Sequence, residues 1–192
     1  DWDYPRKTTW FANTGGGLAS KIVKDWAFYT RESTKGGLAS DQVSALEVVM
    51  GLWAGTQDAG ISRFVGDKWQ TYNTASGLPS NTIYAIAASY DPYRALWVGT
   101  DKGLARFDGA NWKTFTTKDG LPSNRLYALL VDRQKRLWIG MGGGGGLAWY
   151  DGHGFHAVGE PQPITALADR GYFKGEEILR CAESGIEPLV PK

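Results

Sequence analysis

His153 and His156 are the only two histidines of the chain, and they stand three positions apart beside a predicted hairpin turn. Imidazole nitrogens bind transition metals, so a hairpin could bring both rings to one ion. Two ligands are too few for a structural or catalytic metal centre, which uses three or four protein ligands. We therefore expect a solvated turn here and no metal site.

The glycine-rich stretch GMGGGGG, residues 140–146, is a second candidate for chemistry, because glycine loops can cradle phosphate. It lacks the Lys-Ser/Thr pair and the following helix of a phosphate-binding loop. We interpret it as an expanded turn between two strands. The chain also has no Gly-x-Ser-x-Gly motif and no metal-spaced His/Cys cluster, so the sequence predicts neither an enzyme nor a cofactor.

Composition narrows the function classes further. The 192 residues carry 21 basic and 20 acidic side chains, and this balance argues against a nucleic-acid or membrane-surface binder that relies on electrostatics. No run approaches the roughly 18 apolar residues of a spanning helix, so no membrane insertion is expected. Cys181 is the single cysteine, which excludes an intramolecular disulfide. Nine Trp and 26 Gly favour many short strands joined by tight turns.

The elements that would position a site come from an internal repeat. The string LWVGTDKGLARFDGANWKTFTTKDGLPSNRLYALLVD, residues 96–132, aligns with residues 52–89 and 137–158, and residues 9–30 are a more divergent copy. One tryptophan marks the same strand in each unit, at spacings of 43, 44 and 41 residues. Recurrence at one strand position predicts that these indoles pack between the units. They are Trp10, Trp53, Trp97 and Trp138.

Each unit holds four short β-prone segments bounded by Gly, Asp or Asn, and a repeat of about 40–45 residues with four strands has the size of a propeller blade. Pro122 cannot donate to a sheet ladder, so the repeated word GLPSN predicts the link between blades. We predict an all-β fold, a β-propeller of four four-stranded blades within residues 1–163. The expected blades are 8–41, 42–81, 82–124 and 125–163. Blade 1 lacks a convincing first strand.

The repeat string resembles the two-component-regulator propeller repeat, a family found in sensor regions of bacterial hybrid histidine kinases and in other extracytoplasmic proteins. The resemblance covers residues 8–158 and is most specific in the two middle units. It implies a non-catalytic ligand-sensing or protein-interaction module with a periplasmic or extracellular location.

Residues 164–192 depart from the repeat, and Glu176–Ala182 predicts a short helical tail. This segment resembles a fragment of the DDE transposases of bacterial insertion sequences, in which Asp169 would take an acidic catalytic position. A lone carboxylate cannot hold the metal pair that such chemistry needs, so we interpret the segment as a remnant.

The start of the tail also fits the inner-strand pattern of the blades. We expect Ile164–Ala168 to close the ring by pairing beside Thr9–Asn13, because closure removes exposed sheet edges. The alternative is an open half-ring that dimerises into a larger propeller.

In blades of four antiparallel strands, the loops between blades and the loops between second and third strands emerge on one face. Polar side chains on that face could form a small concave ligand site near the axis. The alternative is that they only cap turn backbones. The residues predicted to line this site are Asp41, Asp58, Asn81, Thr82, Asp101, Lys102, Asn124 and Arg125.

The sequence therefore predicts a binding module whose partner is a small-molecule or glycan ligand, or a protein, with no role in nucleic-acid binding. A carbohydrate-binding, lectin-like propeller is the second interpretation. A self-assembling structural scaffold, which would form a homo-oligomer, is the third.

Overall fold

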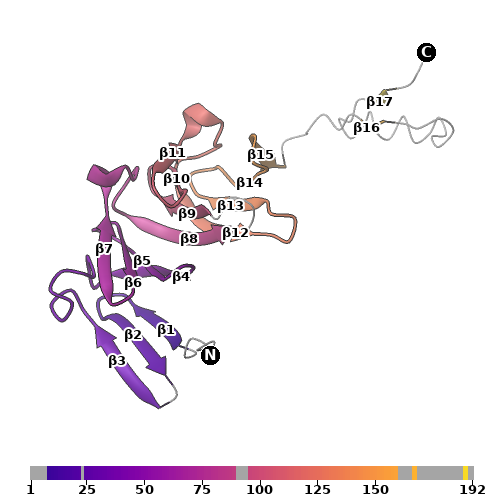
Figure 1. The fold of residues 1–192 in the computed structure, drawn as a ribbon. Helices are drawn as coiled ribbons and strands as arrows, with labels where there is room; N and C mark the ends of the chain where they lie inside the picture. Colours follow the sequence, from indigo (N-terminus) through magenta and orange to yellow (C-terminus); the bar gives the residue numbers. More distant parts are fainter. Residues whose placement is uncertain (1–7, 23, 90–94, 160–165, 168–187, 190–192) are drawn as a thin grey trace. The chain divides into compact units, whose positions relative to one another are not determined.

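The computed structural model describes residues 8–22, 24–89, 95–159, 166–167 and 188–189, and the chain divides into two units, 1–156 and 157–192 (Figure 1). Nearly all described residues belong to short strands and turns, which confirms the all-β prediction. Each repeat unit forms one sheet whose strands follow one another in sequence order. In the third sheet, for example, every pair of neighbouring strands is antiparallel.

Three sheets have four strands each. The second contains β4 (Val43–Val48), β5 (Leu52–Thr56), β6 (Ile61–Val65) and β7 (Lys68–Tyr72). The third contains β8 (Ile83–Ser89), β9 (Ala95–Thr100), β10 (Leu104–Phe107) and β11 (Trp112–Phe115). The fourth contains β12 (Leu126–Val131), β13 (Leu137–Met141), β14 (Leu147–Tyr150) and β15 (Phe155–Val158).

The first sheet corrects the prediction of four strands in every blade. Among the described residues it has three, β1 (Thr8–Asn13), β2 (Gly17–Ile22) and β3 (Asp25–Tyr29), and Trp10 places β1 at the second-strand position of the repeat. The sequence already lacks a β-prone segment for the inner position. Within the described residues, β1 therefore pairs on one edge only, with β2.

The first strand of each four-stranded sheet contains a β-bulge, which the alternation of apolar and polar residues does not predict. The register between the first and second strands shifts at Val43/Ala45, at Ile83/Ala85 and at Leu126/Ala128. A bulge bends a strand and increases its twist, and here it recurs where the chain enters each inner strand.

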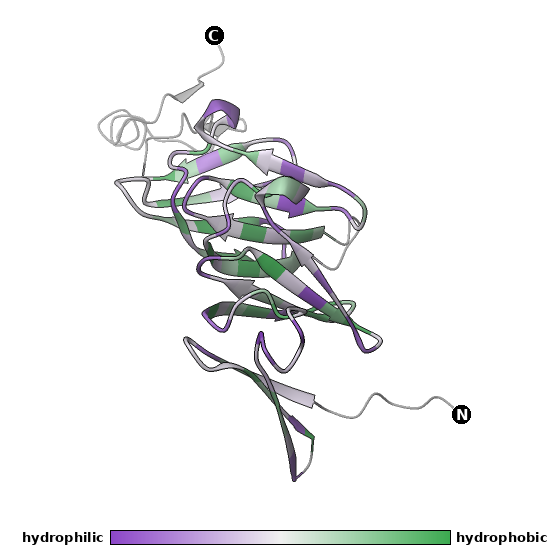
Figure 2. Ribbon diagram, turned by 90° about the vertical axis from the view of Figure 1, so that its left-hand side faces the viewer, coloured by the Kyte–Doolittle hydropathy of each residue, from purple (hydrophilic) through white to green (hydrophobic). Residues whose placement is uncertain are grey.

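The core consists of three apolar clusters, each between neighbouring sheets. Trp53 is 1% exposed in the cluster between the second and third sheets, and Trp97 is 5% exposed between the third and fourth. Both positions agree with the predicted packing of the strand tryptophans. Figure 2 shows how hydrophobic residues concentrate along the strands. Leu18, Leu38, Val43, Leu52 and Ala54 fill the joint between the first two sheets.

The repeated word GLPSN forms the link between blades, as predicted. A short 3-10 turn precedes it, η1 (Thr74–Ser76) or η2 (Thr117–Asp119), and ends at a glycine with positive φ, 106° at Gly77 and 95° at Gly120. This left-handed conformation strains other residues, so the glycine serves the turn. The leucine that follows, Leu78 or Leu121, inserts into a joint between sheets.

In the second unit, β16 (Ala166–Leu167) pairs in parallel with β17 (Pro188–Leu189). The expected pairing of Ile164–Ala168 with Thr9–Asn13 is not confirmed. The predicted helix at Glu176–Ala182 and the acidic position Asp169 lie outside the described residues.

Candidate functional site

The links between blades and the loops between second and third strands meet on one face, as the strand order requires. The amide of Gly60 donates to Asn81 O at 2.9 Å, and that of Gly142 donates to Arg125 O at 2.9 Å. In the first blade, the Gly15 amide donates to Asp41 O at 3.0 Å. The predicted site residues thus come from loops that contact one another.

Three of the predicted site side chains cap nearby backbone. Asp41 Oδ1 accepts from the Arg31 amide at 2.6 Å, and Asn81 Oδ1 accepts from the Thr74 amide at 2.9 Å. Asn124 Oδ1 accepts from the Thr117 amide at 2.8 Å, the same contact one repeat later. These oxygens have a local role, which was the alternative interpretation of this face.

The remaining predicted residues differ in what they offer a ligand. Asp58, Lys102 and Arg125 are exposed, and Thr82 is half-buried. Asp101 is different, because its Oδ1 is buried without a hydrogen-bond partner. A buried acceptor without a donor needs an explanation, and a ligand hydroxyl or amine would supply one. This face therefore stays a predicted site, and Asp101 is its strongest residue.

The two histidines lie in the β14–β15 hairpin, where His153 is 94% exposed and His156 is half-buried. His156 Nε2 lies 3.0 Å from Asp151 Oδ2, and its ring stacks on Trp149 at 4.1 Å. Hydrogen bonds from the amides of Gly154 and His153 and from His156 hold the pKa of Asp151 well below its usual range. Among the described residues, no group of three or more His, Cys, Asp and Glu side chains is arranged to hold a metal ion.

The glycine-rich stretch is a turn between β13 and β14, as predicted. The Met141 amide donates to Gly146 O at 2.8 Å, and Gly143, Gly144 and Gly146 all have positive φ. No helix follows this loop in the described residues; β14 begins at Leu147.

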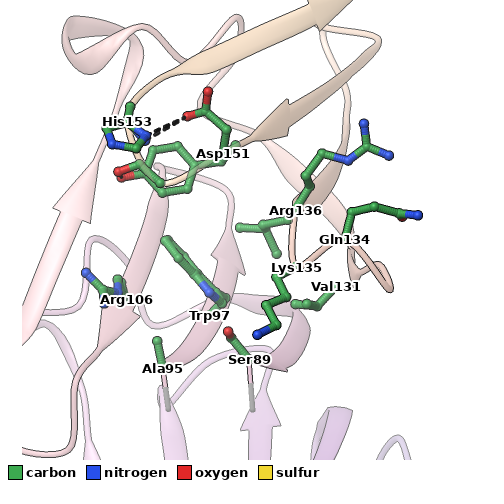
Figure 3. A pocket seen from close by; sticks show the side chains of 13 residues that line it. Ser89, Ala95, Trp97, Arg106, Val131, Gln134, Lys135, Arg136, Asp151 and His153 are labelled. Carbon is green, nitrogen blue, oxygen red and sulfur yellow. Dashed lines mark hydrogen bonds and ion pairs between the residues drawn. The ribbon is translucent and has the colours of Figure 1, made fainter. Parts of the chain in front are cut away.

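A cleft lies between the third and fourth sheets, at the strand ends opposite the predicted face. Its volume is about 450 Å³. The β8–β9 ends, the β12–β13 turn and the β14–β15 hairpin line it, and Figure 3 shows Trp97 at its centre between Arg106 and Lys135. The polar lining residues are Ser89, Arg106, Gln134, Lys135, Arg136, Asp151 and His153.

Cationic side chains outnumber acidic ones among the described residues that line this cleft. Arg106 lies over the Trp97 indole, with Cζ 5.6 Å from the ring centroid, and Lys135 is exposed at the β12–β13 turn. Arg136 is a third cationic residue of the lining, and its Nε lies 2.8 Å from Asp132 Oδ2. Among the described lining residues, Asp151 is the one acidic side chain, and it already accepts from two amides and contacts His156. The lining therefore favours an anionic group.

A smaller cleft of about 160 Å³ occupies the equivalent position one joint earlier, and Trp53 and Arg63 line it as Trp97 and Arg106 line the larger one. The sequence carries a signal for both, since an arginine recurs in the third strand of each middle repeat, opposite the tryptophan. Lys135 and Gln134 distinguish the larger cleft. They belong to the turn Asp132–Arg136, whose length varies among the repeats, so aligning the repeats did not reveal them.

These sheets, joined in sequence order and packed on one another through their strand tryptophans, define a β-propeller repeat protein. A profile of the two component regulator propeller family matches residues 120–143, which form the second GLPSN link, β12 and β13. A sequence comparison with curated proteins gave no significant match.

Solved structures share this fold. The extracellular domain of BT3049 from B. thetaiotaomicron, a protein assigned as a hybrid two component system, matches with a TM-score of 0.70 and 22% identity over 82% of this chain. The extracellular domain of BT4673 from the same organism matches with a TM-score of 0.63 and 20% identity over 84% of this chain. The chain spans 22% and 21% of the lengths of these two structures.

The transposase resemblance of residues 165–192 finds no support in these comparisons. In the described part of the chain, no helix has the length and apolar character needed to span a membrane.

Proposed function

We propose that this chain is a non-catalytic ligand-sensing module of the periplasmic or extracellular space, and that the ligand binds in the cleft between the third and fourth sheets. The observation that carries this proposal is the cleft itself, about 450 Å³ in volume, with an aromatic wall and three cationic side chains. Ligand pockets combine apolar and aromatic walls with a few polar groups in this way.

The lining defines the class of ligand. Arg106 and Lys135 favour a carboxylate, sulfate or phosphate, and the guanidinium of Arg106 can pair with such a group bidentately. Trp97 and Tyr150, with ring centroids 5.5 Å apart, offer apolar surface to a ring. An acidic sugar combines both features, so the proposal joins the sensor and carbohydrate-binding interpretations.

The likeness to structures described as extracellular domains of hybrid two component systems supports both the sensing role and the location outside the cytoplasm. Of the two arrangements, a four-bladed ring closed by Ile164–Ala168 and an open half-ring that pairs with a second copy, we favour the second, because β16 pairs with β17 and β1 pairs only with β2 among the described residues.

A matched pair of lysine variants tests the site. Acidic and neutral oligosaccharides are titrated calorimetrically against the wild type, Lys135→Ala in the cleft and Lys102→Ala on the opposite face. We expect acidic sugars alone to bind, Lys135→Ala to weaken binding about tenfold, and Lys102→Ala to leave it unchanged. Weakening by Lys102→Ala alone would transfer the site to the predicted face around Asp101, and equal binding of neutral sugars would contradict the proposed chemistry.

A further inference from the structure

One repeat position is buried in every blade except the last. It opens the third strand, and it is held by Leu18, Ile61 and Leu104 in the first three sheets, which are 1%, 0% and 0% exposed. The fourth sheet has Leu147 at this position, paired with Gly140 as Leu104 is paired with Gly99. Leu147 is 41% exposed. In the earlier sheets the following blade covers this residue, and in the described part of the chain no fifth blade follows.

The first blade has the complementary feature, an exposed residue at a position that is buried in the other three sheets. The residue after the strand tryptophan is Ala54, Val98 or Ile139 in the other three sheets, and each is 0% exposed against the preceding blade. Its counterpart Phe11 is 44% exposed. On the same face of this sheet, Trp26 is 49% and Phe28 is 70% exposed.

The exposed aromatics of the first blade match residues that are covered in the joints. In the second sheet, Phe64 and Trp69 pack on each other at 4.8 Å and contact Tyr29 of the preceding blade at 6.1 and 6.2 Å. Phe107 and Trp112 repeat this arrangement against Tyr72, at 5.4 and 5.6 Å. By register, Trp26 is the equivalent of Trp69 and Trp112, and it has no such partner sheet among the described residues.

The two exposed surfaces are therefore opposite halves of the same joint. We call Phe11, Trp26 and Phe28 the first end face, and Leu130, Trp138 and Leu147 the last end face. Leu130 is 64% exposed and lies on the last end face because it pairs with Trp138. The joint between the third and fourth sheets brings Leu104 and Ile139 into one cluster, so Leu147 and Phe11 are the residues that a new joint would bring together.

We propose that a second copy of this chain docks its last end face on the first end face, and that the reciprocal contact closes the pair into one ring of eight blades. Each copy carries both halves, so two head-to-tail joints form and neither end face stays exposed. The joint reproduces packing that the molecule already uses three times. Contiguous exposed apolar side chains, such as those of the first and last end faces, are typical of protein–protein interfaces.

A charge-exchange experiment tests the pairing of the two faces. Light scattering coupled to size exclusion is expected to give the mass of two chains for the wild type and of one chain for Phe11→Glu and for Leu147→Lys at the same concentration. Mixing the two variants restores one unmodified joint and one Glu–Lys joint, so the two-chain species returns. Phe28→Glu, at a position 70% exposed, repeats the loss without touching the core. Val65→Glu changes an exposed residue outside both end faces and keeps the two-chain mass.

Three results would overturn the proposal. A wild type with the mass of one chain at all concentrations excludes the joint. A two-chain mass for Leu147→Lys alone indicates a symmetric contact between first end faces. A ladder of larger assemblies shows that the head-to-tail contact does not close.

Discussion

The guanidinium of Arg106 lies over the indole of Trp97, with Cζ 5.6 Å from the ring centroid. The same contact joins Arg63 to Trp53 at 4.9 Å one repeat earlier. In the fourth sheet, Trp149 takes the arginine position opposite Trp138, and Arg136 from the β12–β13 turn lies over both rings, at 5.2 and 5.3 Å. Three consecutive sheets thus place a cation on the strand tryptophan, so the contact belongs to the repeat, and the ligand proposed for the larger cleft would use it secondarily.

Removing the charge from either arginine tests this structural role. We expect Arg106→Met to lower the free energy of unfolding by about 0.5–2 kcal/mol, because a cation–π contact is lost while the aliphatic stem is kept. Arg63→Met should lower it further, because it also removes the hydrogen bond from Nη2 to Met50 O at 2.9 Å. Urea denaturation followed by tryptophan fluorescence measures the change. Arg125→Met, at an exposed link residue, is the control. Wild-type stability in both variants would show that the stacking contributes nothing.

The two glycines that flank β6, Gly60 before it and Gly66 after it, differ in how closely the neighbouring backbone approaches them. A Cβ on Gly60 would lie 2.2 Å from Tyr72 O, and φ at Gly60 is 89°. Gly66 has φ of 52° with nothing within 4 Å of the added Cβ. We expect Gly60→Ala to cost about 2–4 kcal/mol and Gly66→Ala only about 1 kcal/mol, because only the first adds a backbone clash to the strained φ. Equal thermal midpoints for the two variants would contradict the clash.

Most of the fold can be predicted from residues that recur at regular spacing in the sequence. Repetition of the strand tryptophans predicts the four repeat sheets, and repetition of GLPSN predicts the links that follow the second and third of them. The prediction for Ile164–Ala168 rested on a short alternating pattern, which does not specify a partner. In the structure, Ala166–Leu167 pairs with Pro188–Leu189, a segment close in sequence whose loop closure costs less entropy than a pairing across the whole chain.

The site was harder to predict because polar residues at turns have two uses. Asn81 and Asn124 carry the same signal as ligand-binding amides, yet their oxygens cap Thr74 and Thr117. The cleft depends on neighbouring blades, since Ser89 and Lys135 come from different repeats and meet only after the sheets pack.

The repeated asparagine of GLPSN offers a direct test of its local role. We expect Asn124→Ala to cost about 0.5–2 kcal/mol, because the Thr117 amide at the start of η2 loses its acceptor. Asn124→Asp keeps an oxygen acceptor and should retain most of the stability. Thermal unfolding monitored by circular dichroism compares the three proteins. If Asn124→Ala is as stable as the wild type, the side chain has no capping role and is available for a ligand. That result would favour a ligand site on the face formed by the links between blades.

The Asp132 carboxylate makes the free energy of unfolding depend on pH in the acidic range. Partial desolvation raises its pKa, but hydrogen bonds from Trp138 Nε1 and from the amide and Nε of Arg136 outweigh this and lower the pKa to about 2. Because the pKa is below that of the unfolded chain, the unfolded state binds more protons as the pH falls. The stabilisation from Asp132 is therefore fully present above the unfolded value of 3.8 and is lost as the pH falls toward about 2.

Asp132→Asn isolates this contribution. The variant removes the titration and places an amide donor opposite other donors, so we expect a lower thermal midpoint than the wild type at pH 6 and a smaller difference at pH 2. Midpoints at steps between pH 2 and pH 6 measure the convergence. Asp58→Asn removes one negative charge from an exposed loop and controls for net charge. The Asp151 carboxyl also has a lowered pKa, so Asp132→Asn retains part of the acid sensitivity. A difference between wild type and Asp132→Asn that stays constant from pH 6 to pH 2 would show that the carboxylate is not held in its charged form by Trp138 and Arg136.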